Sequence, residues 1–129
     1  MILLDTCAII WDALEPTKLT TNAKKAIKDS SDALVICDIS IWEISMLIKR
    51  NRLKVDDTPS DFIKLILQSR NFRVQEITPE IAELSISFGP EINSDPADRL
   101  ISATSILLSA PLITADQNLI DATLIKTIW

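Results

Sequence analysis

Two patterns of apolar residues alternate along this chain. Short continuous apolar runs, typical of strands buried on both faces, lie at residues 2–4, 34–37 and 112–114. Apolar residues three and four positions apart predict amphipathic helices, which begin near residues 6, 21, 40, 59, 79 and 96. This alternation predicts an α/β fold with a mostly parallel sheet and helices on both faces.

Two weaker apolar segments, at residues 73–77 and 124–128, predict further strands. The segment at 73–77 is the less apolar of the two and is expected nearer an edge of the sheet. A short turn of helix is expected between the last two strands, near residues 118–121.

Polar residues followed by proline predict where several helices begin. Thr58-Pro59, Thr78-Pro79 and Asp95-Pro96 each offer an N-cap and then a proline at the first helical position. Ser40 and Glu43 have the spacing of a capping box, which predicts a helix start at Ser40.

Four acidic residues lie close to the predicted ends of strands or the starts of helices. They are Asp5, Glu43, Asp98 and Asp116. In a parallel sheet the carboxyl ends of the strands share one edge, where crossover connections leave a binding crevice. Taken singly, each acid can be a helix cap or a first-turn residue favoured by the helix dipole. Their conjunction predicts a shared site.

The composition limits the chemistry that such a site can perform. The chain has no histidine and one glycine, Gly89, which excludes His-based catalysis, His-ligated zinc and glycine-rich phosphate loops. Two carboxylates about 4 Å apart repel by about 4 kcal/mol at an effective dielectric constant near 20. Four converging carboxylates therefore predict a hard cation, Mg²⁺ or Mn²⁺.

The length and the apolar fraction predict a soluble protein of one domain. The 129 residues suffice for one core and are too few for two, so we expect one domain over residues 1–129. No apolar run approaches the roughly 18 residues that span a bilayer, so we expect a cytoplasmic protein with no membrane association. Cys7 and Cys37 lack metal-site spacing and are expected to be buried thiols.

Four motifs follow one another along the chain, in the order LLDT, SIWEI, DPADRLISAT and LITAD. Together they resemble the motifs of the PIN-domain ribonucleases, and of the VapC-type toxins of bacterial toxin–antitoxin pairs in particular, and the resemblance covers essentially the whole chain. It implies a five-stranded parallel sheet in the order 3-2-1-4-5. It also implies an endoribonuclease that hydrolyses RNA phosphodiester bonds, with an RNA substrate and a VapB-like antitoxin as partners, and we expect a homodimer.

The resemblance also assigns roles to individual residues. Asp5, Glu43, Asp98 and Asp116 would be both the catalytic residues and the Mg²⁺ ligands, with Mn²⁺ as a substitute. Residues expected near the substrate are Thr6, Arg99 and Thr114, of which Arg99 could instead be structural. The neighbouring Asp95 is assigned to helix capping.

Two rival functions share the alternating topology. A phosphoacceptor receiver domain needs an aspartate after the third strand, and residues 75–78 offer none. A catalytically silent PIN-like binding module would be expected to have lost one of the four acids, and none is missing.

Other candidate residues have two interpretations each. Four basic residues, Lys49, Arg50, Arg52 and Lys54, could bind an RNA backbone or could be a solvated helix end. Trp11 and Trp42 are expected to be core or interface anchors.

Overall fold

Five short strands form one all-parallel sheet in the computed structural model, which describes residues 1–129. The strands are β1 (Ile2–Leu4), β2 (Leu34–Cys37), β3 (Arg73–Gln75), β4 (Leu112–Ile113) and β5 (Thr127–Ile128). Their order is β3-β2-β1-β4-β5, which confirms the predicted sheet and the edge position of the third strand.

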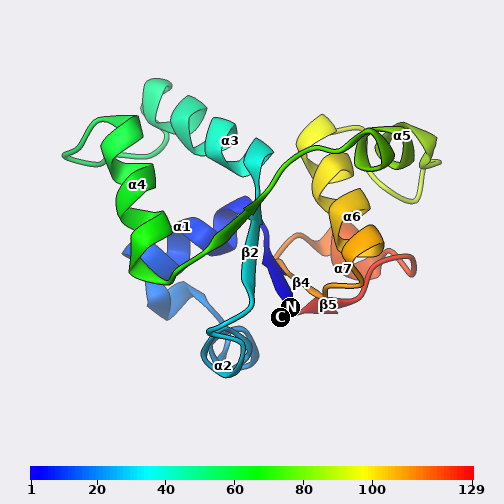
Figure 1. Cartoon of the computed structure of the whole chain (residues 1–129), viewed down its shortest axis with the longest axis horizontal. Coiled ribbons are helices and arrows are strands. Elements are labelled where there is room, and N and C mark those ends of the chain that lie inside the picture. Colours follow the sequence, from blue (N-terminus) through cyan, green and yellow to red (C-terminus); the bar gives the residue numbers. More distant parts are fainter.

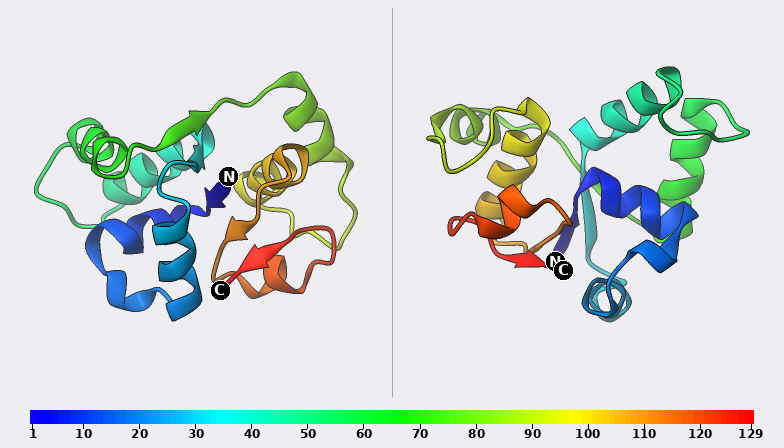
Figure 2. Two further views of the ribbon diagram at one scale, coloured as in Figure 1. Left: turned by 60° about the horizontal axis from the view of Figure 1, so that its bottom comes forward. Right: turned by 180° about the vertical axis from the view of Figure 1, so that it is seen from behind.

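Helices cover both faces of this sheet (Figure 1). One face carries α1 (Thr6–Leu14), α2 (Thr21–Asp29), α3 (Asp38–Lys49) and α4 (Pro59–Ser69), with a 3-10 turn at Pro16–Lys18. The other face carries α5 (Pro79–Ser87), α6 (Pro96–Leu108) and α7 (Gln117–Asp121), as both views in Figure 2 show. No helix has the length and apolar character that crossing a bilayer requires.

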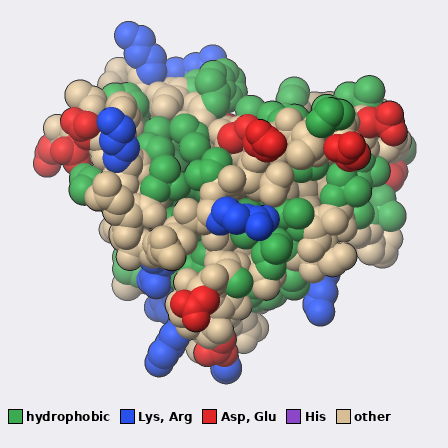
Figure 3. Space-filling model, in the orientation of Figure 1, with side chains coloured by type: hydrophobic (Ala, Val, Ile, Leu, Met, Phe, Trp, Pro, Cys, Tyr) green, Lys and Arg blue, Asp and Glu red, His purple; other side chains and the backbone are tan.

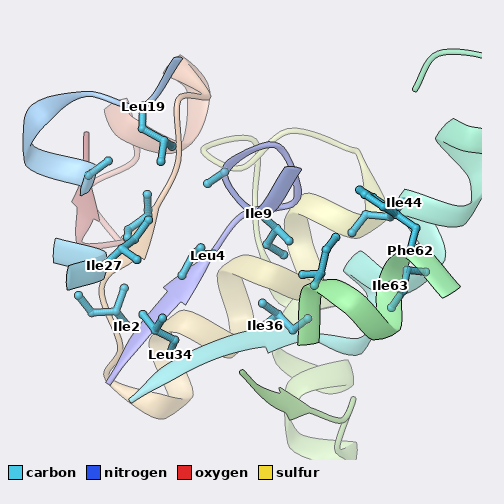
Figure 4. Close-up of a cluster of buried hydrophobic side chains, with 14 residues drawn as sticks. Ile2, Leu4, Ile9, Leu19, Ile27, Leu34, Ile36, Ile44, Phe62 and Ile63 are labelled. Atoms are coloured by element: carbon cyan, nitrogen blue, oxygen red, sulfur yellow. The ribbon is translucent and has the colours of Figure 1, made fainter. Parts of the chain in front are cut away.

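Alternate residues of the central strands bury their side chains on opposite faces of the sheet. Leu4 and Ile36 pack with residues of α1–α4 in one core cluster (Figure 4), whereas Leu3 and Val35 pack against the α6–α7 side. Burying one such side chain stabilises the fold by roughly 1.5–3 kcal/mol. The core therefore fixes the strands, and with them the residues that follow each strand end.

The predicted threonine and aspartate caps are confirmed. The hydroxyls of Thr58 and Thr78 accept from the backbone N–H groups of Asp61 and Ile81, and Asp95 accepts from Ala97 N–H. Each cap of this kind is worth about 1 kcal/mol of stability. The cap of α6 fixes the helix start two residues before Asp98.

The predicted capping box at Ser40 is wrong. Helix α3 begins at Asp38, directly after β2, with Cys37 as its N-cap. Ser40 is fully buried, and its hydroxyl lies 2.8 Å from that of Thr6. The spacing of Ser40 and Glu43 thus reflects two residues on one face of a helix, both turned toward α1.

The last strand is shorter than predicted. β5 comprises only Thr127 and Ile128, which pair with Leu112 and Ile113. The preceding residues form a turn in which the N–H of Ile125 donates to Ala122 O, and Leu124 is exposed. Of residues 124–126, only Lys126 bonds to β4, through its carbonyl, which accepts from Leu112 N–H.

Candidate functional site

The four predicted acids line one cavity at the carboxyl edge of the sheet. Asp5 follows β1, Glu43 lies in the first half of α3, Asp98 lies in the first turn of α6, and Asp116 caps α7. The cavity has a volume of about 420 Å³. The structure therefore brings the predicted residues together, although they come from four separate segments of the chain.

Asp5 is the most buried of these acids and is held by donors on both oxygens. Its Oδ1 accepts from the N–H of Thr6 at 2.8 Å, and its Oδ2 accepts from the hydroxyl of Thr114 at 2.7 Å. Burial raises the pKa of Asp5, and the bonds from Thr114 and Thr6 partly oppose that rise. The carboxylate is therefore fixed in position at the junction of β1 and β4.

Glu43 is aimed by a chain of hydroxyl groups. The hydroxyl of Thr6 donates its one proton to Oε1 of Glu43. The hydroxyl of Ser40 must therefore be the donor in its bond with the Thr6 hydroxyl. Burial raises the pKa of Glu43, the bond from Thr6 lowers it, and the charges of Asp5 and Asp95 raise it further. The second carboxylate oxygen of Glu43 has no hydrogen-bond partner in the protein.

Asp98 and Asp116 each commit one oxygen to the protein. Oδ2 of Asp98 accepts from the side-chain amide of Asn93 at 2.8 Å, and Oδ1 of Asp116 accepts from the N–H groups that begin α7. Burial, followed by the charges of Asp5, Asp95 and Asp116, raises the pKa of Asp98 to about 7 against a lowering bond from Asn93. The pKa of the Asp98 carboxyl group therefore lies close to neutral pH.

No lysine or arginine neutralises these acids. The three ion pairs of the chain, Lys18–Glu15, Lys25–Asp29 and Arg70–Asp12, all lie elsewhere. Unbonded oxygens from several carboxylates, with no cationic partner, are the donor set that a hard divalent cation prefers. As the side chains stand, however, no three Asp, Glu or Cys residues are grouped closely enough to hold a metal ion together. The metal ligands therefore stay a prediction.

The three residues expected near a substrate have different surroundings. Thr6 lines the cavity, whereas Thr114 is completely buried behind Asp5. Arg99 directs its five N–H groups at backbone carbonyls, those of Ser85, Phe88, Gly89, Ile92 and Asn93. A guanidinium has five donors, so none remains for a phosphate. The contacts of Arg99 favour the structural alternative for this residue, and the roles of Thr6, Arg99 and Thr114 toward a substrate stay a prediction.

Two further polar residues line the cavity. Asp95 caps α6, as predicted, and is the fifth acidic residue that lines the cavity. Cys7 donates weakly to Asp5 at 3.8 Å, and burial followed by the charge of Asp5 raises the pKa of its thiol to about 12. Cys7 is therefore neutral, and both cysteines are free, as expected. The one sequence signal that Asp95 lines the cavity is that it lies three residues before Asp98.

An apolar cavity of about 630 Å³ adjoins the acidic one and shares Glu43 and Asp95 with it. Its apolar lining includes Ile39, Trp42 and Met46, and the Trp42 side chain is 58% exposed. Trp42 is therefore a surface residue. Trp11 instead packs against Trp129, with ring centroids 5.8 Å apart.

The basic cluster of the sequence lies at the end of α3. Lys49, Arg50, Arg52 and Lys54 are exposed, and none forms an ion pair. Basic side chains are visible at the top of the face in Figure 3, over the end of α3. Arg50 also lines the apolar cavity.

Comparisons with known proteins give matches in both sequence and fold. The sequence model of the PIN domain matches residues 2–123. Ribonuclease VapC22 of Mycobacterium tuberculosis (strain ATCC 25618 / H37Rv) is 30% identical over 118 residues, which are 92% of this chain and 88% of that protein.

Solved structures share the fold at lower identity. The crystal structure of VapBC2 from Rickettsia felis, bound to a DNA fragment from its promoter, has a TM-score of 0.73 at 14% identity. That match covers 98% of this chain and 97% of the other. A toxin–antitoxin complex from Klebsiella pneumoniae has a TM-score of 0.68 at 22% identity, covering 96% and 94%.

Proposed function

The chain belongs to the PIN-domain family, and we propose that it is a Mg²⁺-dependent endoribonuclease that serves as the toxin of a toxin–antitoxin pair. The observation that carries the proposal is the cavity in which Asp5, Glu43, Asp98 and Asp116 meet without a protein cation. The 30% identity to a ribonuclease across most of the chain supplies the substrate class.

Asp5, Asp98 and Asp116 would hold Mg²⁺, for which Mn²⁺ can substitute, and Glu43 would ligate it or orient the attacking water. The divalent ion supplies Lewis-acid activation of water and offsets the negative charge of the scissile phosphate. The free oxygen of Glu43 can accept a proton from that water, and its raised pKa suits a general base. Thr6 and Ser40 keep Glu43 aimed into the cavity.

The basic cluster supports RNA as the substrate. A net charge of −5 disfavours general nucleic-acid binding, so the unpaired cations at residues 49–54 are the surface on which a phosphate backbone would lie. They follow α3, which also carries Glu43.

A VapB-like antitoxin is the proposed protein partner. Two of the structural neighbours are described as VapBC or toxin–antitoxin complexes, and the apolar cavity beside the acids offers such a partner a docking place. A basic side chain of the antitoxin could replace the cation, while apolar side chains pack against Trp42. The homodimer stays a prediction.

The nuclease proposal is tested by incubating the purified protein, free of any partner, with RNA. We expect cleavage with Mg²⁺ or Mn²⁺, none with EDTA, and none from Asp5→Asn. Asp57→Asn, an exposed aspartate in a loop, is the matched control and should cleave normally. Equal cleavage by Asp5→Asn and wild type would indicate a contaminating nuclease and contradict the proposal. RNA binding without cleavage would favour a catalytically silent PIN-like module.

A further inference from the structure

Asn93 lies in the connection between α5 and α6, and every polar atom of its side chain is bonded. One N–H of its amide faces Oδ2 of Asp98 at 2.8 Å, and the other faces Oδ1 of Asn118 at 3.1 Å. Its Oδ1 accepts from the backbone N–H of Asp95 at 2.9 Å. An amide with both protons and its oxygen engaged has one orientation.

Asn118 connects Asn93 to the part of the cavity that Asp116 lines. It lies in α7, two residues after Asp116, and its Oδ1 accepts from both the side chain and the backbone N–H of Asn93. The backbone N–H of Asn118 itself donates to Asp116. The two asparagines therefore link the start of α6, which carries Asp98, to the start of α7, which Asp116 caps.

The backbone of Asn93 is also fixed. Its carbonyl accepts from Nε of Arg99 at 2.8 Å, and the rest of that guanidinium binds carbonyls of Ser85, Phe88, Gly89 and Ile92. Arg99 thus holds the connection from which Asn93 reaches toward Asp98. Ile92, the residue before Asn93, is 1% exposed and anchors the same connection in the core.

We propose that Asn93, braced by Asn118, is a positioning residue that sets the Asp98 carboxylate at the distance from Asp116 that a shared divalent cation requires. This inference rests on the proposed metal-dependent function. Hydrogen bonds behind a metal ligand fix its orientation, and their loss typically costs about 10-fold to 100-fold in metal affinity or activity. The contact from Asn93 also leaves Oδ1 of Asp98 free for a cation.

The test measures Mn²⁺ affinity by the electron paramagnetic resonance signal of free Mn²⁺, alongside RNA cleavage and melting temperature. We expect Asn93→Ala to raise the dissociation constant of Mn²⁺ by about 10-fold. Cleavage should fall at low Mn²⁺ and recover at saturating Mn²⁺. Asn118→Leu, which leaves the bonds of Asn93 to Asp98 and Asp95 in place, should act in the same direction with a smaller effect. Gln117→Ala, whose amide binds Asp121 on the surface, is the matched control.

The outcomes separate this inference from the proposed function. If wild type binds no Mn²⁺ and cleaves no RNA, the function itself fails. If wild type does both, and the two asparagine variants bind Mn²⁺ within twofold of wild type, the inference is overturned, even where their melting temperatures fall. Should Asn93→Ala not fold, Asn118→Leu decides the question, since it keeps the anchors of the α5–α6 connection.

Discussion

The hydroxyl of Thr114 donates to Oδ2 of Asp5 across 2.7 Å, joining two residues that lie 109 positions apart in the sequence. The bond links the ends of the adjacent strands β1 and β4 and is completely buried on the threonine side. Asp5 therefore owes its place at the base of the cavity to a contact that only the folded sheet creates.

Removing this bond should destabilise the protein. Thr114→Val keeps the shape of the side chain but removes the hydroxyl that donates to the buried carboxylate of Asp5 and accepts from the backbone N–H of Asp116, which typically costs about 1–3 kcal/mol. Urea unfolding at pH 7 measures the loss. The matched control is Thr104→Val, because Thr104 is also buried but only donates to Leu100 O of its own helix. Equal losses of stability in the two variants would mean that the bond to Asp5 stabilises the protein no more than an ordinary bond within a helix.

The stability of the metal-free protein should fall as the pH rises through the titration of Asp98. The folded protein raises the pKa of this group from its ordinary value of 3.8 to about 7, so the folded state holds a proton that the unfolded state has released. Stability relative to Asp98→Asn should therefore decrease between about pH 4 and 7 and level off above pH 7. Thermal unfolding of both proteins across this range measures the difference. A flat difference would contradict the assigned environment of Asp98.

Divalent cations should reverse that loss. At pH 8, Mg²⁺ or Mn²⁺ at about 10 mM should raise the melting temperature of wild type, because an ion that binds only the folded state stabilises it. At pH 5 the protonated Asp98 should weaken the effect, and Asp98→Asn should blunt it at both pH values. A melting temperature indifferent to both ions would rule out the shared site.

Arg99→Lys should lower the stability of the protein more than it lowers its affinity for RNA. A lysine offers three donors from one atom and cannot reach five carbonyls, so the α5–α6 connection loses several bonds. We expect about 1–3 kcal/mol of destabilisation in urea. Arg73→Lys, at an exposed arginine, is the control. A raised KM for RNA with unchanged stability would restore the phosphate contact that the structure argues against.

Trp42→Ala should weaken the complex with the antitoxin while sparing RNA cleavage. An exposed tryptophan beside an apolar cavity is the kind of anchor that dominates interface energy, so we expect at least about a tenfold rise in Kd. Titration calorimetry with the purified antitoxin measures it. Leu65→Ala, which removes a comparably exposed side chain from α4, should leave the Kd unchanged. Equal affinity of wild type and Trp42→Ala would place the partner elsewhere.

The strand order could be predicted because the chain's motifs resemble those of a known family, whereas the parallel sheet and the gathering of the four acids also follow from the chain's own periodicity. Asp5 and Asp116 follow β1 and β4, Glu43 lies in the helix that follows β2, and parallel strands end at one edge. The helix starts at Thr58, Thr78 and Asp95 could also be predicted, because an N-cap residue and the proline after it are neighbours in the sequence.

The contacts that orient the acids could not be predicted, because they join distant segments through side chains. The spacing of Ser40 and Glu43 fits a capping box as well as two residues facing Thr6, and only packing of α3 against α1 decides between them. Arg99 binds backbone carbonyls, which carry no sequence signal. Asn93 and Asn118 are 25 residues apart and show no pattern that links them.

The most direct test of a shared metal site is the anomalous diffraction of Mn²⁺ in crystals of the protein soaked in MnCl₂. The account predicts an anomalous peak in the cavity, within coordination distance of carboxylate oxygens of Asp5, Asp98 and Asp116, and its absence from crystals of Asp98→Asn. A protein that cleaves RNA yet shows no peak in this cavity, or that binds Mn²⁺ only at other residues, would contradict it.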